Sequence, residues 1–317
     1  MTGPVPELAD VAAAAARLRP LLAPTPLVRS ERFDGWLKLE TLQVTGSYKV
    51  RGALNAMLVA LAAGDRRPVI AASAGNHARG VAWAAQRLGL TAQTVVPVTA
   101  PRTKVRGTEA LGASVIRWGN TFEDALVHAR QLADRHDWRF LPAFDDADVI
   151  AGQGTVGWEL LELLPDVVLV PLGGGGLAAG IGLALKSRGV KVIGVHVDGL
   201  DAMARALAGR GPLEEARTTI ADGVRVRAVG ELTRGICAQV LDDIVVVPEA
   251  IVQKTIVDLA SFDRVVAEGA GALACAALAR VRARRKVAVV SGGNIDIETL
   301  AALTRDDRPS YGGAHLN

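Results

Sequence analysis

The sequence predicts an α/β protein in which two mostly parallel β-sheets are covered by helices. From about residue 68 onward, short β-branched runs alternate with longer, alanine-rich stretches of helical character. Strands that are apolar along their whole length are typical of sheets buried on both faces, and helices between successive strands indicate parallel connections. The 317 residues are enough for one large or two medium-sized domains.

The first set of strand–helix units is expected to form a small domain of residues 68–142. Its strands are expected at 68–72, 92–97 and 113–118, and its helices at 76–88, 102–111 and 122–135. Gly89 and Gly112 would close the first two of these helices.

The remaining elements are expected to form a large domain that combines residues 1–67 with 143–317. They are a strand at Trp36 to Leu39, a helix that opens at Lys49, strands at 166–171, 190–197 and 287–292, and a helix at 176–187. No repeat of fixed period and no low-complexity linker interrupts this pattern.

Composition excludes several classes of function. The formal net charge is only +3, and Lys and Arg are interspersed with Asp and Glu, so we expect no nucleic-acid partner. The densest basic run, residues 282–286, is interpreted as a solvated helix end. Two cysteines, Cys237 and Cys275, make neither a disulfide framework nor a tetrahedral metal site, and they fit a reducing compartment.

No segment approaches the ~20 apolar residues that a membrane-spanning helix needs, and the N-terminus lacks a basic leader. We therefore expect a cytoplasmic protein without a membrane partner.

Three unusual loops, at 73–77, 173–176 and 291–294, each follow a predicted strand. In open parallel sheets, ligands bind outside the carboxyl ends of the strands. If the two sheets face each other, these loops converge on one cleft.

The loop at 173–176 consists of four glycines between a strand and a helix. Its backbone N–H groups would form an open nest that binds a phosphate, whereas a tight turn alone needs only one or two glycines. The run also satisfies Gly-x-Gly-x-x-Ala, ending at Ala178, and Asp198 ends the following strand. A nicotinamide-binding module is therefore an alternative.

Lys49 opens a helix after the small and polar residues 45–48. The positive end of the helix dipole, together with partial burial, would lower the pKa of its amine. A neutral amine is what Schiff-base chemistry needs. The alternative is an ordinary surface lysine, as Lys38 and Lys104 are expected to be.

The loop SAGNH at 73–77 places N–H groups and short side chains where they suit a carboxylate. Its histidine could simply cap a helix or pack. The loop SGGN at 291–294 offers a hydroxyl that could face a ligand ring, although on its own it is typical of a turn.

Taken together, these motifs resemble the threonine dehydratase and serine racemase family. The segments TGSYKVRGA, SAGNHARG, FDDADVIAGQGT, GGGG, TIADGVRV and SGGN occur in the family's order, between about residues 25 and 296. The resemblance implies a pyridoxal-phosphate enzyme of fold type II, the two-domain fold of the tryptophan-synthase β-subunit. It makes the nicotinamide alternative much less favoured.

The family's site residues carry over by position. Lys49 would form the Schiff base with pyridoxal 5'-phosphate, Asn76 would bind its phenolic oxygen, and Ser291 would face its pyridine nitrogen. The cofactor phosphate would be held by Gly173, Gly174, Gly175 and Gly176. The substrate carboxylate would be received by the loop made of Ser73, Ala74, Gly75, Asn76 and His77.

Two departures from the family pattern are informative. Serine racemases carry a second serine at the position of Ala74, where it serves as the acid or base on the other face of Cα. The family's two acidic metal ligands fall on His196 and Ala202, although Asp198 and Asp201 lie nearby. Hard cations prefer oxygen ligands, so we expect no metal.

We therefore expect a dehydratase (ammonia-lyase) that performs β-elimination on a small β-hydroxy amino acid such as threonine or serine, yielding a 2-oxo acid and ammonia. Lys49 would remove the Cα proton, and a neutral Ser291 would favour prompt elimination. A racemase, a β-replacement enzyme and a non-catalytic cofactor-binding protein remain alternatives. A homodimer is expected.

Overall fold

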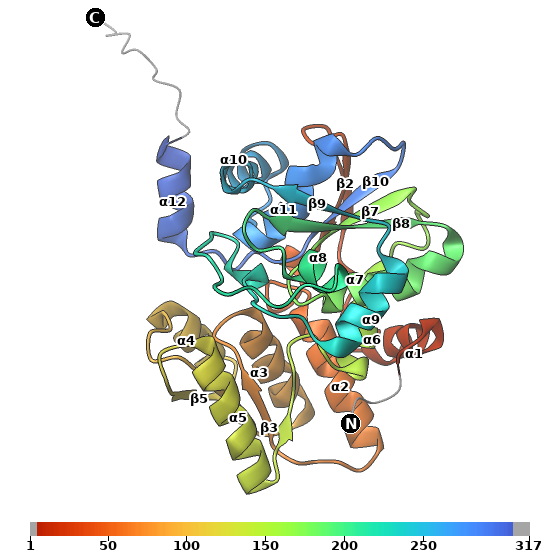
Figure 1. Cartoon of the computed structure of the whole chain (residues 1–317). Helices are drawn as coiled ribbons and strands as arrows, with labels where there is room; N and C mark the ends of the chain where they lie inside the picture. Colours follow the sequence, from red (N-terminus) through yellow and green to blue (C-terminus); the bar gives the residue numbers. More distant parts are fainter. Residues whose placement is uncertain (1–4, 307–317) are drawn as a thin grey trace, which may run out of the picture.

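A computed structural model describes residues 5–306 of the chain, and it contains two β-sheets (Figure 1). The six-stranded sheet has the spatial order β1 (Leu27–Ser30), β2 (Gly35–Leu39), β10 (Lys286–Val290), β7 (Val167–Pro171), β8 (Lys191–Val197) and β9 (Asp243–Val247). Only β1 and β2 pair in antiparallel fashion within it.

The four-stranded sheet is parallel throughout. Its spatial order is β5 (Ser114–Arg117), β4 (Ala92–Val96), β3 (Val69–Ala72) and β6 (Arg139–Phe140). Around it lie α3 (Asn76–Leu88), α4 (Arg102–Glu109) and α5 (Phe122–His136). Two mostly parallel sheets covered by helices confirm the predicted fold class.

Helices cover both faces of the six-stranded sheet. On one face pack α10 (Glu249–Asp258), α11 (Gly269–Ala277) and α12 (Ile297–Asp306). On the other pack α1 (Leu8–Leu18), α6 (Ala147–Trp158), α7 (Gly176–Leu185), the short α8 (Ala202–Leu207) and α9 (Glu231–Val240). Because helices cover both faces of the sheet, β7 and β10 are buried along their whole length.

Helix α2 (Lys49–Ala62) lies between α3 and α6, so it contacts helices associated with both sheets. Its buried residues Val50, Leu54 and Met57 pack against α3 and the four-stranded sheet. The position of Lys49 at the first turn of α2 is therefore fixed by a helix with packing on two sides.

The strands and helices predicted from the sequence are all present, with ends within two residues of the expected ones. Elements that the sequence did not predict include β1, β6, β9, α1 and α6. The division of the chain at residues 67/68 and 142/143 into two domains stays a prediction.

The basic run at 282–286 is only partly a solvated segment. Arg282, Arg284 and Arg285 are exposed, as expected. Lys286 is instead 8% exposed at the start of β10, and its Nζ donates to the carbonyls of Leu278 and Val281 at 3.3 and 3.4 Å. The prediction was wrong there because the strand begins one residue earlier than the apolar pattern indicated.

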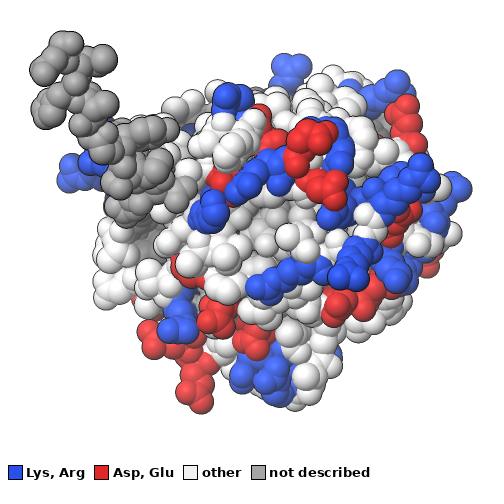
Figure 2. All heavy atoms as spheres, turned by 90° about the horizontal axis from the view of Figure 1, so that it is seen from above, with Lys and Arg blue, Asp and Glu red and all other residues white. Residues whose placement is uncertain are grey.

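Acidic and basic side chains are interspersed over the face seen in Figure 2. Both cysteines are buried and free. Within residues 5–306, no helix has the length and apolar character that crossing a membrane would require.

Candidate active site

The segment that precedes α2 is tied to the loop that follows β10. Ser47 and Gly292 form an isolated antiparallel bridge, flanked by backbone hydrogen bonds of 3.1 Å from Tyr48 to Ser291 and 2.9 Å from Gly293 to Gly46. This pairing seats the first turn of α2, with Lys49, beside the loop 291–294.

The Lys49 amine has a carbonyl, and no carboxylate, as its partner within the part of the chain that the structure describes. Its Nζ donates to the carbonyl of Ala143 at 2.8 Å and lies 5.2 Å from the centre of the Tyr48 ring. No carboxylate of residues 5–306 lies within ion-pair distance of it. Burial lowers the pKa of the Lys49 amine to about 8, against a smaller raising effect from the charge of Glu268.

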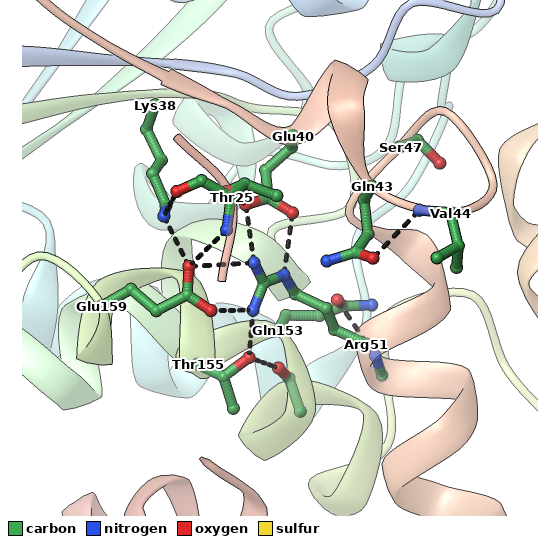
Figure 3. A network of polar contacts seen from close by, with 12 residues as sticks. Thr25, Lys38, Glu40, Gln43, Val44, Ser47, Arg51, Gln153, Thr155 and Glu159 are labelled. Carbon is green, nitrogen blue, oxygen red and sulfur yellow. Dashed lines mark hydrogen bonds and ion pairs between the residues drawn. The ribbon is translucent and has the colours of Figure 1, made fainter. Parts of the chain in front are cut away.

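The two lysines expected to be ordinary surface residues behave differently. Lys104 is partly exposed and pairs with Asp222. Lys38 is buried, which contradicts the expectation, because its ammonium pairs with Glu159 at 2.5 Å and donates to the carbonyl of Thr25 at 2.7 Å. Figure 3 shows Lys38 in a network with Arg51 and Glu40.

The loop 73–77 connects β3 to α3. Residues 73–76 are partly exposed, and the Ser73 hydroxyl accepts a 3.2 Å hydrogen bond from the backbone of Gly75. His77 is buried, with Nε2 3.0 Å from the carbonyl of Leu141. Burial and the nearby charge of Lys49 lower the pKa of His77 to about 3. The ring therefore packs in neutral form, which leaves its backbone as the part that could reach a substrate.

The side chain of Asn76 is held from two directions. Its Nδ2 donates to Glu268 Oε1, and its Oδ1 accepts a 2.7 Å hydrogen bond from Asn294 Nδ2. One N–H of the Asn76 amide remains available for a ligand.

Glu268 was missed by the sequence interpretation. It is 7% exposed and precedes α11 at the N-cap position, but its side chain makes no capping hydrogen bond. Burial, followed by the charge of Asp222, raises the pKa of Glu268 to about 7 against the lowering effects of Asn76, Lys104 and Asn294. An acidic residue just before a helix is ordinarily interpreted as a helix cap. No local sequence pattern therefore indicated that Glu268 lies beside Asn76.

The four-glycine loop is buried, and the backbone N–H groups of residues 173–176 donate no hydrogen bond to any residue in 5–306. Buried N–H groups without partners are rare, so they indicate an acceptor such as a phosphate. A Cβ on Gly174 would lie 2.4 Å from the Phe144 ring, and Gly175 has a φ of +91°. Packing against Phe144 and the positive φ of Gly175 therefore also require glycine at these two positions.

The loop at 143–144 links Lys49 to these glycines. Ala143 accepts the hydrogen bond from the Lys49 amine, and the adjacent Phe144 packs against Gly174 and Gly176. Ser291 is 3% exposed, with its hydroxyl 3.3 Å from the carbonyl of Ala270. Two cavities of about 460 and 530 Å³ lie beside α1 and α6, and neither is lined by Lys49 or Asn76.

The positions matched to the family's metal ligands contain no acidic pair. His196 is buried in β8, and neither ring nitrogen has a hydrogen-bond partner within the described part of the chain. Burial lowers the pKa of His196 to about 4. Ala202 opens α8, Asp198 is exposed, and Asp201 lies 3.7 Å from Arg210. Residues 5–306 contain no cluster of three or more His, Cys, Asp and Glu residues suited to a metal.

Comparisons with known proteins give a consistent result. The family model described as pyridoxal-phosphate dependent enzyme matches residues 18–292. The catabolic L-threonine dehydratase TdcB of Escherichia coli strain K12 is 40% identical over 313 residues, which cover 93% of this chain and 95% of that protein.

Solved structures are similar over nearly the whole chain. The processed form of threonine deaminase isoform 2 from Solanum lycopersicum has a TM-score of 0.88 at 36% identity, covering 94% of this chain and 86% of that one. Maize serine racemase has a TM-score of 0.89 at 28% identity, covering 96% and 98%.

Proposed function

The chain belongs to the family of pyridoxal-phosphate dependent enzymes, and we propose that it is a dehydratase (ammonia-lyase) acting on L-threonine or a closely related β-hydroxy amino acid. Its cofactor is pyridoxal phosphate. The observation that carries the proposal is Lys49, whose amine has a lowered pKa and pairs with no carboxylate of residues 5–306, at a site shared with Asn76 and the glycine loop.

The residues present fit this cofactor. The unpartnered N–H groups of residues 173–176 suit its phosphate, the free N–H of Asn76 suits its phenolic oxygen, and the Lys49 amine suits its carbonyl carbon. Ser291 would lie against the pyridine ring. When bound, the cofactor supplies an electron sink that stabilises negative charge at the substrate Cα.

The protein's own groups would provide the proton chemistry and the orientation. A Lys49 pKa of about 8 leaves part of the amine neutral near physiological pH, so that it can take the Cα proton and hold it on Nζ. The partly exposed loop 73–76, at the N-terminus of α3, would orient the substrate carboxylate.

Ala74 favours elimination over racemization. Racemization needs a proton donor on each face of Cα, and the methyl group of Ala74 has no proton to give. Ser73 is the neighbouring hydroxyl, and it is engaged with the backbone of Gly75 at 3.2 Å. The 40% identity to a threonine dehydratase supports the same choice.

A homodimer and a cytoplasmic location are also part of this proposal. The buried, free cysteines support a reducing compartment.

Purified protein assayed with a panel of β-hydroxy amino acids tests the proposed function. We expect L-threonine and L-serine to yield 2-oxo acids together with equimolar ammonia. Chiral analysis of the remaining substrate should show little inversion at Cα. Inversion that is faster than 2-oxo acid release would contradict the dehydratase assignment in favour of a racemase, and yellow protein without either activity would support a cofactor-binding protein.

A further inference from the structure

We propose that Glu268 is a positioning residue, whose carboxylate orients the Asn76 amide toward the cofactor and whose charge acts on Lys49. This inference rests on the proposed function, because it concerns the same site.

A directed chain of hydrogen bonds supports the orienting role. The Arg79 guanidinium, which can only donate, donates to Asn294 Oδ1. Asn294 Nδ2 then donates to Asn76 Oδ1 at 2.7 Å, and Asn76 Nδ2 donates to Glu268 Oε1. Because the ionised carboxylate can only accept, the two ends of the chain fix both amides. The remaining N–H of Asn76 is left as a donor, which is what a phenolic oxygen requires.

The surroundings of Glu268 direct its carboxylate toward the Asn76 amide. Its backbone N–H donates to Gly292 at 3.1 Å, and a Cβ on Gly292 would lie 2.4 Å from Glu268 Oε1, so the carboxylate occupies space that only glycine leaves open. Within residues 5–306 the carboxylate forms no ion pair. A carboxylate at an N-cap usually stabilises its own helix, but this one is directed to Asn76 instead.

Burial, followed by the charge of Asp222, raises the pKa of Glu268 to about 7. The groups that face it are Lys49 and Tyr48 of the α2 segment, Lys104 of α4 and Asp222 of the loop 219–226. Asp296, beside Lys104, adds a further negative charge. When ionised, Glu268 raises the pKa of Lys49, which opposes the lowering by burial. With Glu268 ionised, the Lys49 nitrogen therefore keeps its proton to a higher pH than burial alone would allow.

Two variants of Glu268 separate charge from packing. Glu268→Gln keeps the size and removes the charge, and Glu268→Asp keeps the charge. The measurement is the absorbance of the bound cofactor in the holoprotein, titrated with pH in the absence of substrate. We expect the pH at the midpoint of this absorbance change to be about 1 unit lower in Glu268→Gln than in wild type. This is the low end of the pKa shift that one nearby opposite charge causes. The midpoint should stay closer to wild type in Glu268→Asp.

Asp222→Asn is a second test that leaves Glu268 itself unchanged. Asp222 raises the pKa of Glu268, so its neutralisation should move the acid limb of the kcat/KM profile to lower pH. Asp222 is half-exposed, so the substitution should not prevent folding. If Glu268→Gln does not fold, an unchanged acid limb in Asp222→Asn overturns the inference.

Midpoints that agree between wild type and Glu268→Gln, with both proteins holding cofactor, would show that the charge of Glu268 does not act on Lys49, and the inference would be overturned. A wild-type protein that is colourless and inactive on the substrate panel would contradict the proposed function instead. The two failures are therefore distinguishable.

Discussion

Lys49 and Arg51 lie two residues apart on the first turn of α2, and their surroundings differ completely. Arg51 is 2% exposed and pairs with Glu40 at 2.8 Å and with Glu159 at 2.6 Å (Figure 3). These carboxylates raise the pKa of the Arg51 guanidinium despite its burial. Lys49 has no such partner, and burial lowers its pKa to about 8.

The difference between these two residues shows that burial alone does not decide what a basic side chain does. Desolvation disfavours the charge of both groups, and nearby carboxylates reverse that effect only for Arg51. The network of Arg51, Lys38, Glu40 and Glu159 pairs every charge and holds α2 against α6 and β2. The Arg51 guanidinium is held by its two carboxylate partners, whereas the partly buried Lys49 amine has only the carbonyl of Ala143 as a hydrogen-bond partner within residues 5–306.

Removal of Lys49 should have the largest effect on activity. We expect Lys49→Ala to lose the cofactor absorbance and to lower kcat by at least about 10²–10⁴-fold, the range typical of a placed acid–base group. Absorbance spectra and 2-oxo acid release are the measurements. Because Lys49 forms no ion pair with any residue in 5–306, far-ultraviolet circular dichroism should remain that of wild type. A Lys49→Ala protein with normal turnover would refute the assignment of Lys49 as the lysine that binds the cofactor.

Removal of Arg51 should instead lower stability. Arg51→Met leaves Glu40 and Glu159 with unbalanced buried charge, which costs about 3–5 kcal/mol in comparable cases. The free energy of unfolding in urea is the measurement. Lys254→Met is the matched control, because it removes an exposed partner of Asp258 and should cost less than about 1 kcal/mol. Equal losses in the two variants would show that the Arg51 network contributes no more than a surface pair.

The sequence singled out Lys49 as the candidate lysine, but it could not predict the carboxylates that pair with Arg51 and not with Lys49. The strand–helix alternation and the loop motifs are local patterns, which is why the predicted elements lie within two residues of the observed ones. Glu268 meets Asn76 across 192 positions, and Lys38 meets Glu159 across 121. Periodicity carries no information on such pairings, so Lys38 was wrongly taken as exposed.

Helix α6 was missed for a different physical reason. Its glycines at 152, 154 and 157 lower its intrinsic helix propensity. They are required because a Cβ on Gly152 would lie 2.7 Å from the backbone of α2, and one on Gly154 would lie 2.8 Å from Gly180 of α7. Close helix packing thus overrides the local preference.

Ala74→Ser should change the reaction rather than the fold. If the new hydroxyl reaches Cα, the ratio of racemization to elimination should rise, by at most the roughly 10²–10⁴-fold typical of general acid catalysis. Chiral analysis of serine alongside measured pyruvate gives the ratio. Ala74→Gly is the control, since it changes the side chain without adding a proton donor. A rise of equal size in both variants would argue against proton donation by the introduced hydroxyl as the cause.

Chelation should have the smallest effect. The family's metal positions hold His196 and Ala202, which cannot form a two-carboxylate site for a hard cation. Activity should therefore stay within experimental error after exhaustive treatment with a chelator. Loss of activity that magnesium restores would point to Asp198 or Asp201 as ligands.

The placement of β10 has a consequence for biosynthesis. β10 lies between β2 and β7 in the middle of the six-stranded sheet, although it comes from near the end of the described chain. Until residues 286–292 leave the ribosome, β2 lacks its parallel neighbour and the backbone partner of Ser47 does not exist. Between the synthesis of β7 and that of β10, a nascent chain thus carries two unfinished sheet edges, a state prone to association with other chains. The sheet can close, and the segment before Lys49 can gain its backbone partner, only after residues 286–292 have been synthesised.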